Sequence, residues 1–316
     1  MVESSSPSPS SSSSSFSAAA PSSSDTLEIA ALKVLYAEDP WTKAEYGDVA
    51  ARLWLDGSIK FPYLHDSALP PVPRRPARLP TVQLVAPRDM PKLGKGGSLR
   101  SRQALLHSLV HTESWAIDLS WDIIARFGKA ESMPREFFDD FVKVAQDEGR
   151  HFQLLATRLG ELGSSYGALP AHDGLWDSAE ATAHDLSARL VVEHCVHEAR
   201  GLDVLPTTIS RFRKGGDDLT ADLLESVIYP EEITHCAAGV RWFTFLCLQS
   251  DPMTCLTTSL CSQSQGTPSH VIAAFHLLVR KYFRGPLKPP FNRSARAAAG
   301  FGPEWYEPLT MEVPVV

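Results

Sequence analysis

The chain has 316 residues, with 30 Lys and Arg against 37 Asp and Glu, which gives a formal net charge of −7. A chain of this length buries a sizeable apolar core, so a metal site would serve function rather than hold the fold together. The acidic balance argues against nucleic-acid binding and favours a small-molecule partner. No apolar run approaches the roughly 20 residues of a membrane-spanning helix, and the cysteines form no CxxC pair. We therefore expect a cytoplasmic protein with reduced thiols.

The composition divides the chain into four segments. Residues 1–24 are mostly Ser, Pro and Ala, and we expect a disordered tail without the features of a signal peptide. Residues 25–97 hold two short helical patterns and then a proline-rich stretch, which we expect to lie as an extended strap over the fold. Residues 98–250 carry long helical patterns, and residues 251–316 hold an inserted loop, a fifth helix over about 269–283 and a C-terminal extension.

Four long helices are predicted in the third segment. The first covers about 98–128 and the second about 134–163, each with a capping residue or proline at its start and a glycine at its end. The third opens with a capping box at Asp177 and must stop before Pro206. The fourth covers about 218–248 and is interrupted by a proline. Helices of this length are about 40 Å long, as in a four-helix bundle, and no stretch alternates as a strand would. The predicted fold class is all-α.

An internal repeat of acidic and histidine residues runs through these helices. In each half, a Glu on one helix is followed 35 or 34 residues later by a Glu-x-x-His pair on the next helix: Glu113, then Glu148 and His151; Glu198, then Glu232 and His235. Residues at i and i+3 share one helix face, so such a pair can hold one metal ion while its carboxylate bridges to a second. Four carboxylates also balance two divalent ions, whereas four acids facing a metal-free core would be costly. The repeat predicts a two-metal site of the di-iron carboxylate type.

Six stretches of the sequence resemble the ferritin-like family known as domain of unknown function 455. The resemblance covers about residues 27–316 and is carried by residues 105–113, 145–152, 169–176, 198–206, 231–239 and 288–292. More distantly, the chain is similar to the ferritin-like hydroxylase that oxidises a modified adenosine in tRNA and to other di-iron oxygenases. The resemblance implies a ferritin-like four-helix bundle, with an N-terminal helical and proline-rich extension and a C-terminal fifth helix. It also implies the six metal ligands, and it does not imply a substrate.

Several residues beside the predicted ligands have two possible roles. Tyr229 stands three residues before Glu232 and is the candidate catalytic side chain, with ordinary half-buried packing as the alternative. Glu193 stands about 140° around a regular helix from Glu198, so we expect it off the metal face, near the ligands or at the surface. The remaining neighbours are expected to hydrogen-bond, to pack or to form surface ion pairs, or else to orient the ligands: His111, Asp147, Arg150, His194, His197, Arg200 and Asp203.

These observations predict a non-haem di-iron oxidoreductase. It would bind two iron ions, Fe/Fe rather than Mn/Fe, with Glu148 and Glu232 as bridging ligands, and would use dioxygen to hydroxylate, desaturate or N-oxygenate an organic small molecule. Electrons would come from an external donor, because the sequence has no flavin or nicotinamide fingerprint. The alternatives are a ferroxidase that handles iron and a non-catalytic scaffold stabilised by metal. A tRNA substrate and a homodimer stay open.

Overall fold

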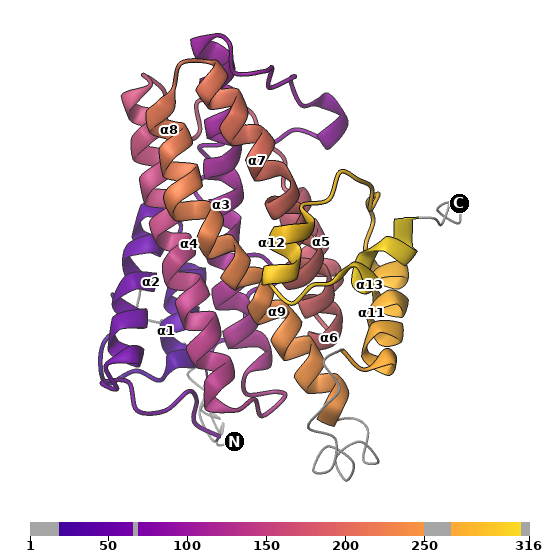
Figure 1. The fold of residues 1–316 in the computed structure, drawn as a ribbon. Coiled ribbons are helices and arrows are strands. Elements are labelled where there is room, and N and C mark those ends of the chain that lie inside the picture. The colour runs from indigo at the N-terminus through magenta and orange to yellow at the C-terminus, as the bar shows by residue number, and fades with distance from the viewer. Residues whose placement is uncertain (1–18, 66–68, 250–266, 311–316) are drawn as a thin grey trace, which may run out of the picture.

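The computed structural model describes residues 19–65, 69–249 and 267–310 (Figure 1). These residues are almost entirely helix and loop, and the one β-type pairing among them is a parallel bridge between Leu84 and Ala171. The all-α prediction is confirmed. Most of the predicted N-terminal tail and of the predicted loop before the fifth helix lies outside the described residues. None of the described helices is long and apolar enough to cross a membrane.

Two of the predicted long helices have the predicted ends. The helix α3 (Leu99–Phe127) begins where Ser98 Oγ accepts a hydrogen bond from the Ser101 N–H at 3.2 Å. The helix α4 (Arg135–Glu161) follows a short turn and begins directly after Pro134. Local capping fixes both starts, so the sequence alone was sufficient to place them.

The other two long helices are composite, and each contains a wide turn of π-helix. The third is built from α6 (Leu186–Arg189), η2 (Leu190–His197) and α7 (Glu198–Lys214). The fourth is built from α8 (Asp218–Leu223), η3 (Leu224–Ile228) and α9 (Tyr229–Gln249), and it passes through Pro230. We predicted an interruption of this helix at Pro230. The structure instead has a π turn, η3, which ends two residues before Pro230. Such turns are rare and are frequently found at functional sites.

The prediction for the third helix was wrong at both ends. Asp177 lies inside a separate short helix, α5 (Gly174–Ala181), and the long helix starts later, where the Asp185 carboxylate accepts from the Ala188 N–H. The helix also continues through Pro206 to Lys214. Pro206 has no N–H for the Leu202 carbonyl, and Asn292 replaces it, since its Nδ2 donates to that carbonyl at 3.0 Å. A distant side chain therefore supplies the bond that the proline removes.

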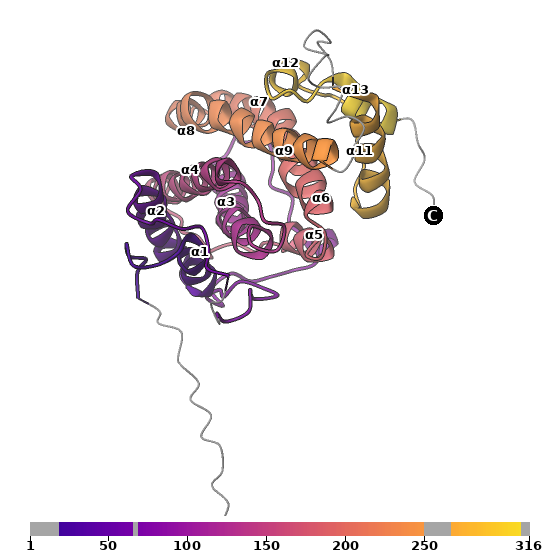
Figure 2. The same ribbon diagram turned by 90° about the horizontal axis from the view of Figure 1, so that it is seen from below.

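Two covering layers enclose the four long helices (Figure 2). On one side, α1 (Leu27–Tyr36) and α2 (Pro40–Leu55) pack on α3 and α4, as the two short helical patterns predicted. On the other side, four short elements cover α7 and α9: α11 (Ser269–Tyr282), α12 (Arg293–Ala298), α13 (Pro303–Tyr306) and η4 (Glu307–Thr310). The fifth helix is confirmed as α11.

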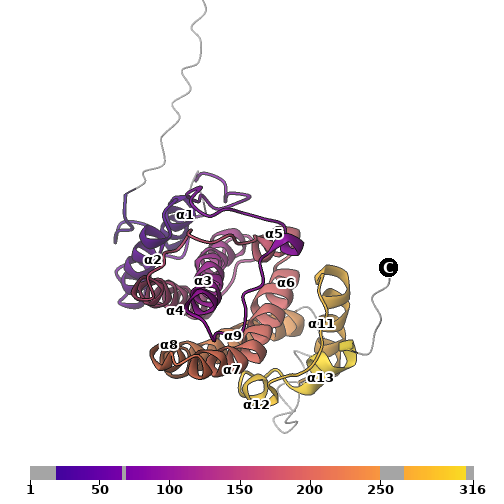
Figure 3. The same cartoon turned by 90° about the horizontal axis from the view of Figure 1, so that it is seen from above.

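The proline-rich strap runs from α1 to α5 and then back along α3 (Figure 3). It contains one short 3-10 turn, η1 (Pro87–Asp89). Its backbone is fixed to α1, where the Ala77 N–H donates to the Leu35 carbonyl at 2.9 Å. Arg78 ties it to α3, because its guanidinium donates to the Asp118 carboxylate at 2.6 Å. The strap is thus bound to the bundle as predicted, and it closes cavities against α3.

Candidate metal centre

The four long helices bring all six predicted ligands into one cluster. Five of the six residues are no more than 8% exposed, and Glu198 is half-buried. Their ligand atoms form two groups in which all atoms lie within 4.8 Å of one another. The first group holds Glu113, Glu148, His151 and Glu232, and the second holds Glu148, Glu198, Glu232 and His235. Each group has one imidazole, and the two groups share two carboxylates.

The shared carboxylates lie between the two histidines. Glu148 Oε2 is 3.4 Å from His151 Nδ1, and Glu148 Oε1 is 3.0 Å from His235 Nδ1. Glu232 repeats this arrangement, with Oε1 at 3.5 Å from His151 Nδ1 and Oε2 at 3.8 Å from His235 Nδ1. Each of the two carboxylates thus presents one oxygen to each group, which is the arrangement that a bridging ligand requires.

Three buried atoms of the cluster lack a hydrogen-bond partner. These are Glu148 Oε2 and the Nδ1 atoms of His151 and His235. Buried polar groups are nearly always satisfied, and a bound cation would satisfy this carboxylate oxygen and both ring nitrogens at once. Four carboxylates and two imidazoles form a donor set that suits a pair of divalent transition-metal ions. The residues present therefore fit two metals.

An outer pair of carboxylates orients the two histidines. His151 Nε2 lies 2.7 Å from Glu231 Oε2, and His235 Nε2 lies 3.5 Å from Asp147 Oδ2. Arg150 joins these carboxylates, because one Nη2 donates to Asp147 at 2.7 Å and to Glu231 at 2.6 Å. Bonding at Nε2 leaves Nδ1 of each ring facing the cluster, as metal-binding histidines require.

The two halves of the repeat differ at this outer layer. Arg150 and Asp147 orient ligands, which was one of their two predicted roles. Asp203 instead accepts from the Arg296 guanidinium and from the Asn292 N–H, and so it fixes the C-terminal layer. Glu231 was not singled out in the sequence, although it stands directly before Glu232. Its partner His151 is 80 residues away, so only the fold reveals its role.

The electrostatics of the cluster favour proton uptake when no cation is present. Burial, followed by repulsion from Glu148, raises the pKa of Glu113 well above its usual value. Burial and repulsion from Glu232 do the same to the pKa of Glu198. Burial alone would raise the pKa of Glu148 and lower that of His235, but their mutual attraction holds the first low and the second high. Metal binding at this cluster would therefore release protons.

Among the described residues, the Tyr229 hydroxyl has no hydrogen bond to a predicted ligand. It is half-buried, and its hydroxyl accepts a hydrogen bond from Asn292 Nδ2 at 2.6 Å, toward the C-terminal layer. This contact agrees with the packing alternative, and the catalytic role of Tyr229 stays a prediction. The contact gives the predicted catalytic residue a structural role beside α12.

The remaining candidates also lie outside the cluster. Glu193 is 1% exposed, with His197 Nε2 at 3.9 Å from its Oε2, so it is buried rather than at the surface. It stands in η2, where the angle of a regular helix does not apply. His194 is buried against Phe141. His111 has the hydrogen-bonding role expected of it, with Nδ1 at 2.9 Å from the Tyr166 hydroxyl.

Comparison with known proteins places the chain in a family. The family described as "Protein of unknown function (DUF455)" matches residues 36–307. An uncharacterized protein from Haemophilus influenzae (strain KW20 / Rd) is 34% identical over 224 residues, which span 69% of this chain and 70% of the relative. No solved structure matches the chain. The resemblance found in the sequence is thereby confirmed at the level of the family, and the chain belongs to the DUF455 family.

Proposed function

We propose that the chain is a ferritin-like, non-haem di-iron oxidoreductase that uses dioxygen to oxidise an organic small molecule. The observation that carries the proposal is the position of Glu148 and Glu232, each with one oxygen toward each buried histidine. A site for a single structural ion would need only one such group. Two overlapping groups, built from two halves of an internal repeat, suit a pair of ions that act together.

The residues around the cluster have distinct tasks in this proposal. Glu113 and His151 would hold one iron, Glu198 and His235 the other, and the shared carboxylates both. Reduced iron, when bound, would supply electrons and open coordination positions to dioxygen. Asp147 and Glu231 keep the imidazole nitrogens aimed inward, and the buried walls keep water out. Glu198 is the most exposed of the six, so we place access for the organic molecule on its side of the cluster.

The first experiment is a count of metal per chain in protein purified in air, with an optical spectrum before and after anaerobic reduction and re-exposure to air. We expect about two irons and a transient band induced by oxygen. Oxygen uptake that needs an external reductant supports the oxidoreductase. If oxygen uptake instead increased only with the amount of ferrous iron added, the protein would be a ferroxidase. Folded protein that binds no metal would overturn the proposal.

The metal content of three variants tests which residues bind the ions. Glu148→Ala removes a ligand of both groups, so both ions should be lost. His151→Ala removes a ligand of one group and should leave about one ion. Glu193→Gln is the matched control, because Glu193 is as deeply buried but lies outside both groups. An unchanged metal content in Glu148→Ala would contradict the ligand assignment.

A further inference from the structure

A large cavity lies under the strap, on the side of α3 that faces away from the ligand cluster. Its volume is about 420 Å³, and its walls are α3, strap residues 90–94 and the loop 169–172 that leads into α5. His111 projects into it about 160° around the helix from Glu113. Two stretches that carry the family resemblance, 105–113 and 169–176, therefore meet at this cavity. The metal cluster uses one residue of the first and none of the second.

The charge of the cavity wall is opposite to that of the chain. Among the described residues, those that line the wall include Lys92 and Arg100 but no Asp or Glu. In the described structure, neither cation has an acidic partner. Burial lowers the pKa of His111 to about 3 and that of His107 to about 4, so these two rings are neutral at pH 7. The positive charge is therefore concentrated at Lys92 and Arg100.

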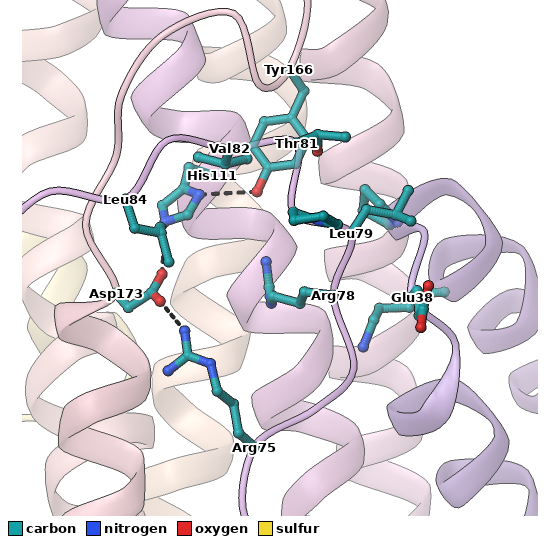
Figure 4. Close-up of a pocket in the computed structure, with 13 residues that line it drawn as sticks. Glu38, Arg75, Arg78, Leu79, Thr81, Val82, Leu84, His111, Tyr166 and Asp173 are labelled. Atoms are coloured by element: carbon teal, nitrogen blue, oxygen red, sulfur yellow. Dashed lines mark hydrogen bonds and ion pairs between the residues drawn. The ribbon is translucent and has the colours of Figure 1, made fainter.

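A smaller neighbouring cavity of about 210 Å³ provides a comparison (Figure 4). It also contains cations, but each of them has a carboxylate partner within the protein. Arg75 pairs with Asp173, and both Arg78 and Lys43 pair with Asp118, at 2.6 and 2.5 Å. The Arg75 and Arg78 pairs hold the strap in place, and the Lys43 pair joins α2 to α3. The unpaired cations of the larger cavity have no such structural role.

The larger cavity changes from charged to apolar along α3. Arg100 stands in the first turn of the helix, and Trp115 stands 15 residues later, about 22 Å along the axis. The Trp115 ring stacks on Trp176 with centroids 5.2 Å apart, and Leu169 and Leu175 complete this end. The stacked indoles make the apolar end a rigid wall. The cavity thus offers one end with two exposed cations and one end with an aromatic and aliphatic wall. The guanidinium groups of Arg75 and Arg78, which are paired with carboxylates, lie over the Trp115 ring at that second end.

We propose that this cavity binds a small organic anion with an apolar body, its acidic head against Lys92 and Arg100 and its body toward Trp115 and Leu175. Pockets of this volume, apolar with a few placed polar groups, are typical of small-molecule sites. Both cations are exposed, so a neutral ligand would gain no attraction from them, whereas a cationic ligand would be repelled. The site is separate from the metal cluster, so binding does not depend on the proposed oxidation.

The test is calorimetric titration of the full chain with three probes that share one alkyl body: octanoate, octan-1-ol and octylammonium. Octanoate should bind saturably at one per chain. Octan-1-ol should bind at least about tenfold more weakly, and octylammonium should not bind. Arg100→Gln should weaken octanoate about tenfold. The control Arg88→Gln makes the same change in the strap, at an exposed residue outside the cavity wall, and should leave the affinity unchanged.

A variant that fills the cavity completes the test. Ala104 lines the wall on α3, and Ala104→Trp should abolish octanoate binding. Ala104→Leu is the milder second variant, to be used if circular dichroism shows that the first does not fold. Equal affinity for octanoate and octan-1-ol would overturn the proposal, as would the absence of saturable heat at millimolar octanoate. Either result would leave the metal count and oxygen uptake of the proposed oxidoreductase untouched.

Discussion

Glu231 Oε2 lies 2.7 Å from Nε2 of His151, and this contact joins α9 to α4 across the ligand cluster. The same ring presents Nδ1 to Glu148 and Glu232 on its other side. Glu231, which directly precedes the predicted ligand Glu232 on α9, therefore orients the predicted ligand His151 on α4. Asp147 and His235 repeat the relationship in the opposite direction, at 3.5 Å.

The first prediction follows from this contact. Glu231→Ala should weaken metal binding by about 10- to 100-fold, because His151 loses the partner that fixes its ring. Glu231→Gln keeps an oxygen at the same position and should recover part of the loss. Competition with a chelator of known affinity measures both. The control is Glu161→Ala on α4, which breaks only a surface pair with Arg158 and should bind metal normally. Equal affinities in all three variants would refute the orienting role.

The second prediction concerns the helix that passes through Pro206. Asn292→Ala should lower the free energy of unfolding by about 1–3 kcal/mol, since the Leu202 carbonyl loses its donor. Pro206→Ala restores a backbone N–H, so in that background the cost of Asn292→Ala should be smaller. Urea denaturation of the four proteins of this cycle gives the coupling.

Asn292 also donates to the Tyr229 hydroxyl, and the control must remove that second effect. Tyr229→Phe deletes the hydroxyl alone, so its cost should not depend on Pro206→Ala. If the losses of unfolding free energy in Asn292→Ala and Pro206→Ala were additive, the Leu202 carbonyl would not need the hydrogen bond from Asn292.

The third prediction is a pH dependence that depends on Glu193. Burial raises the pKa of this carboxyl to about 7 in the folded chain, against 4.5 as the ordinary value. The folded state therefore binds the proton more tightly than the unfolded state. Its contribution is fully present below pH 4.5 and is lost as the pH rises through about 7, with a total of about 3 kcal/mol.

Glu193→Gln removes this ionisation while keeping the shape of the side chain. The unfolding free energy of the variant minus that of the native chain should therefore increase by about 3 kcal/mol between pH 4.5 and pH 8. Urea denaturation of metal-free protein at several pH values measures it. A constant difference across this range would show that Glu193 is not held neutral by the fold.

The fourth prediction compares two helical glycines. A Cβ at Gly239 would lie 2.0 Å from the carbonyl oxygen of His194, so Gly239→Ala should cost at least about 3 kcal/mol as α9 is pushed from η2. A Cβ at Gly149 would lie 3.5 Å from Ala44, an ordinary contact. Gly149→Ala should therefore raise stability by up to about 1 kcal/mol. Thermal unfolding of both variants decides the matter, and similar melting temperatures would be inconsistent with it.

The parts of the fold that the sequence predicts correctly depend on local signals. Ser98 caps α3 through a contact within its own turn, so the start of that helix is readable without the fold. The spacing of Glu148 and His151 likewise defines one face of one helix. Both statements need only the geometry of a single element, and both agree with the structure.

The parts that could not be predicted depend on contacts between distant residues. A proline normally ends a helix, and the donor that lets the chain pass Pro206 comes from Asn292, 90 residues after Leu202. The role of Glu231 depends on His151 in the same way. The π turns add a third limit, because a pattern at 3.6 residues per turn does not reveal the π turn in which Glu193 stands. The conclusion drawn from that pattern, that Glu193 lies off the metal face, nevertheless agrees with the structure.

The two π turns also decide where the chain can change length. A π turn holds one residue more than the α-turn it replaces, while the helix on either side keeps its facing. Deleting one residue from Leu224–Ile228 would therefore close the turn and leave Glu232 and His235 aimed at the cluster. The same deletion in the regular helix before Glu148 would rotate the preceding half of α4 by about 100° against its neighbours. Among the four long helices, we therefore expect tolerance to a single deletion in the two that contain a π turn.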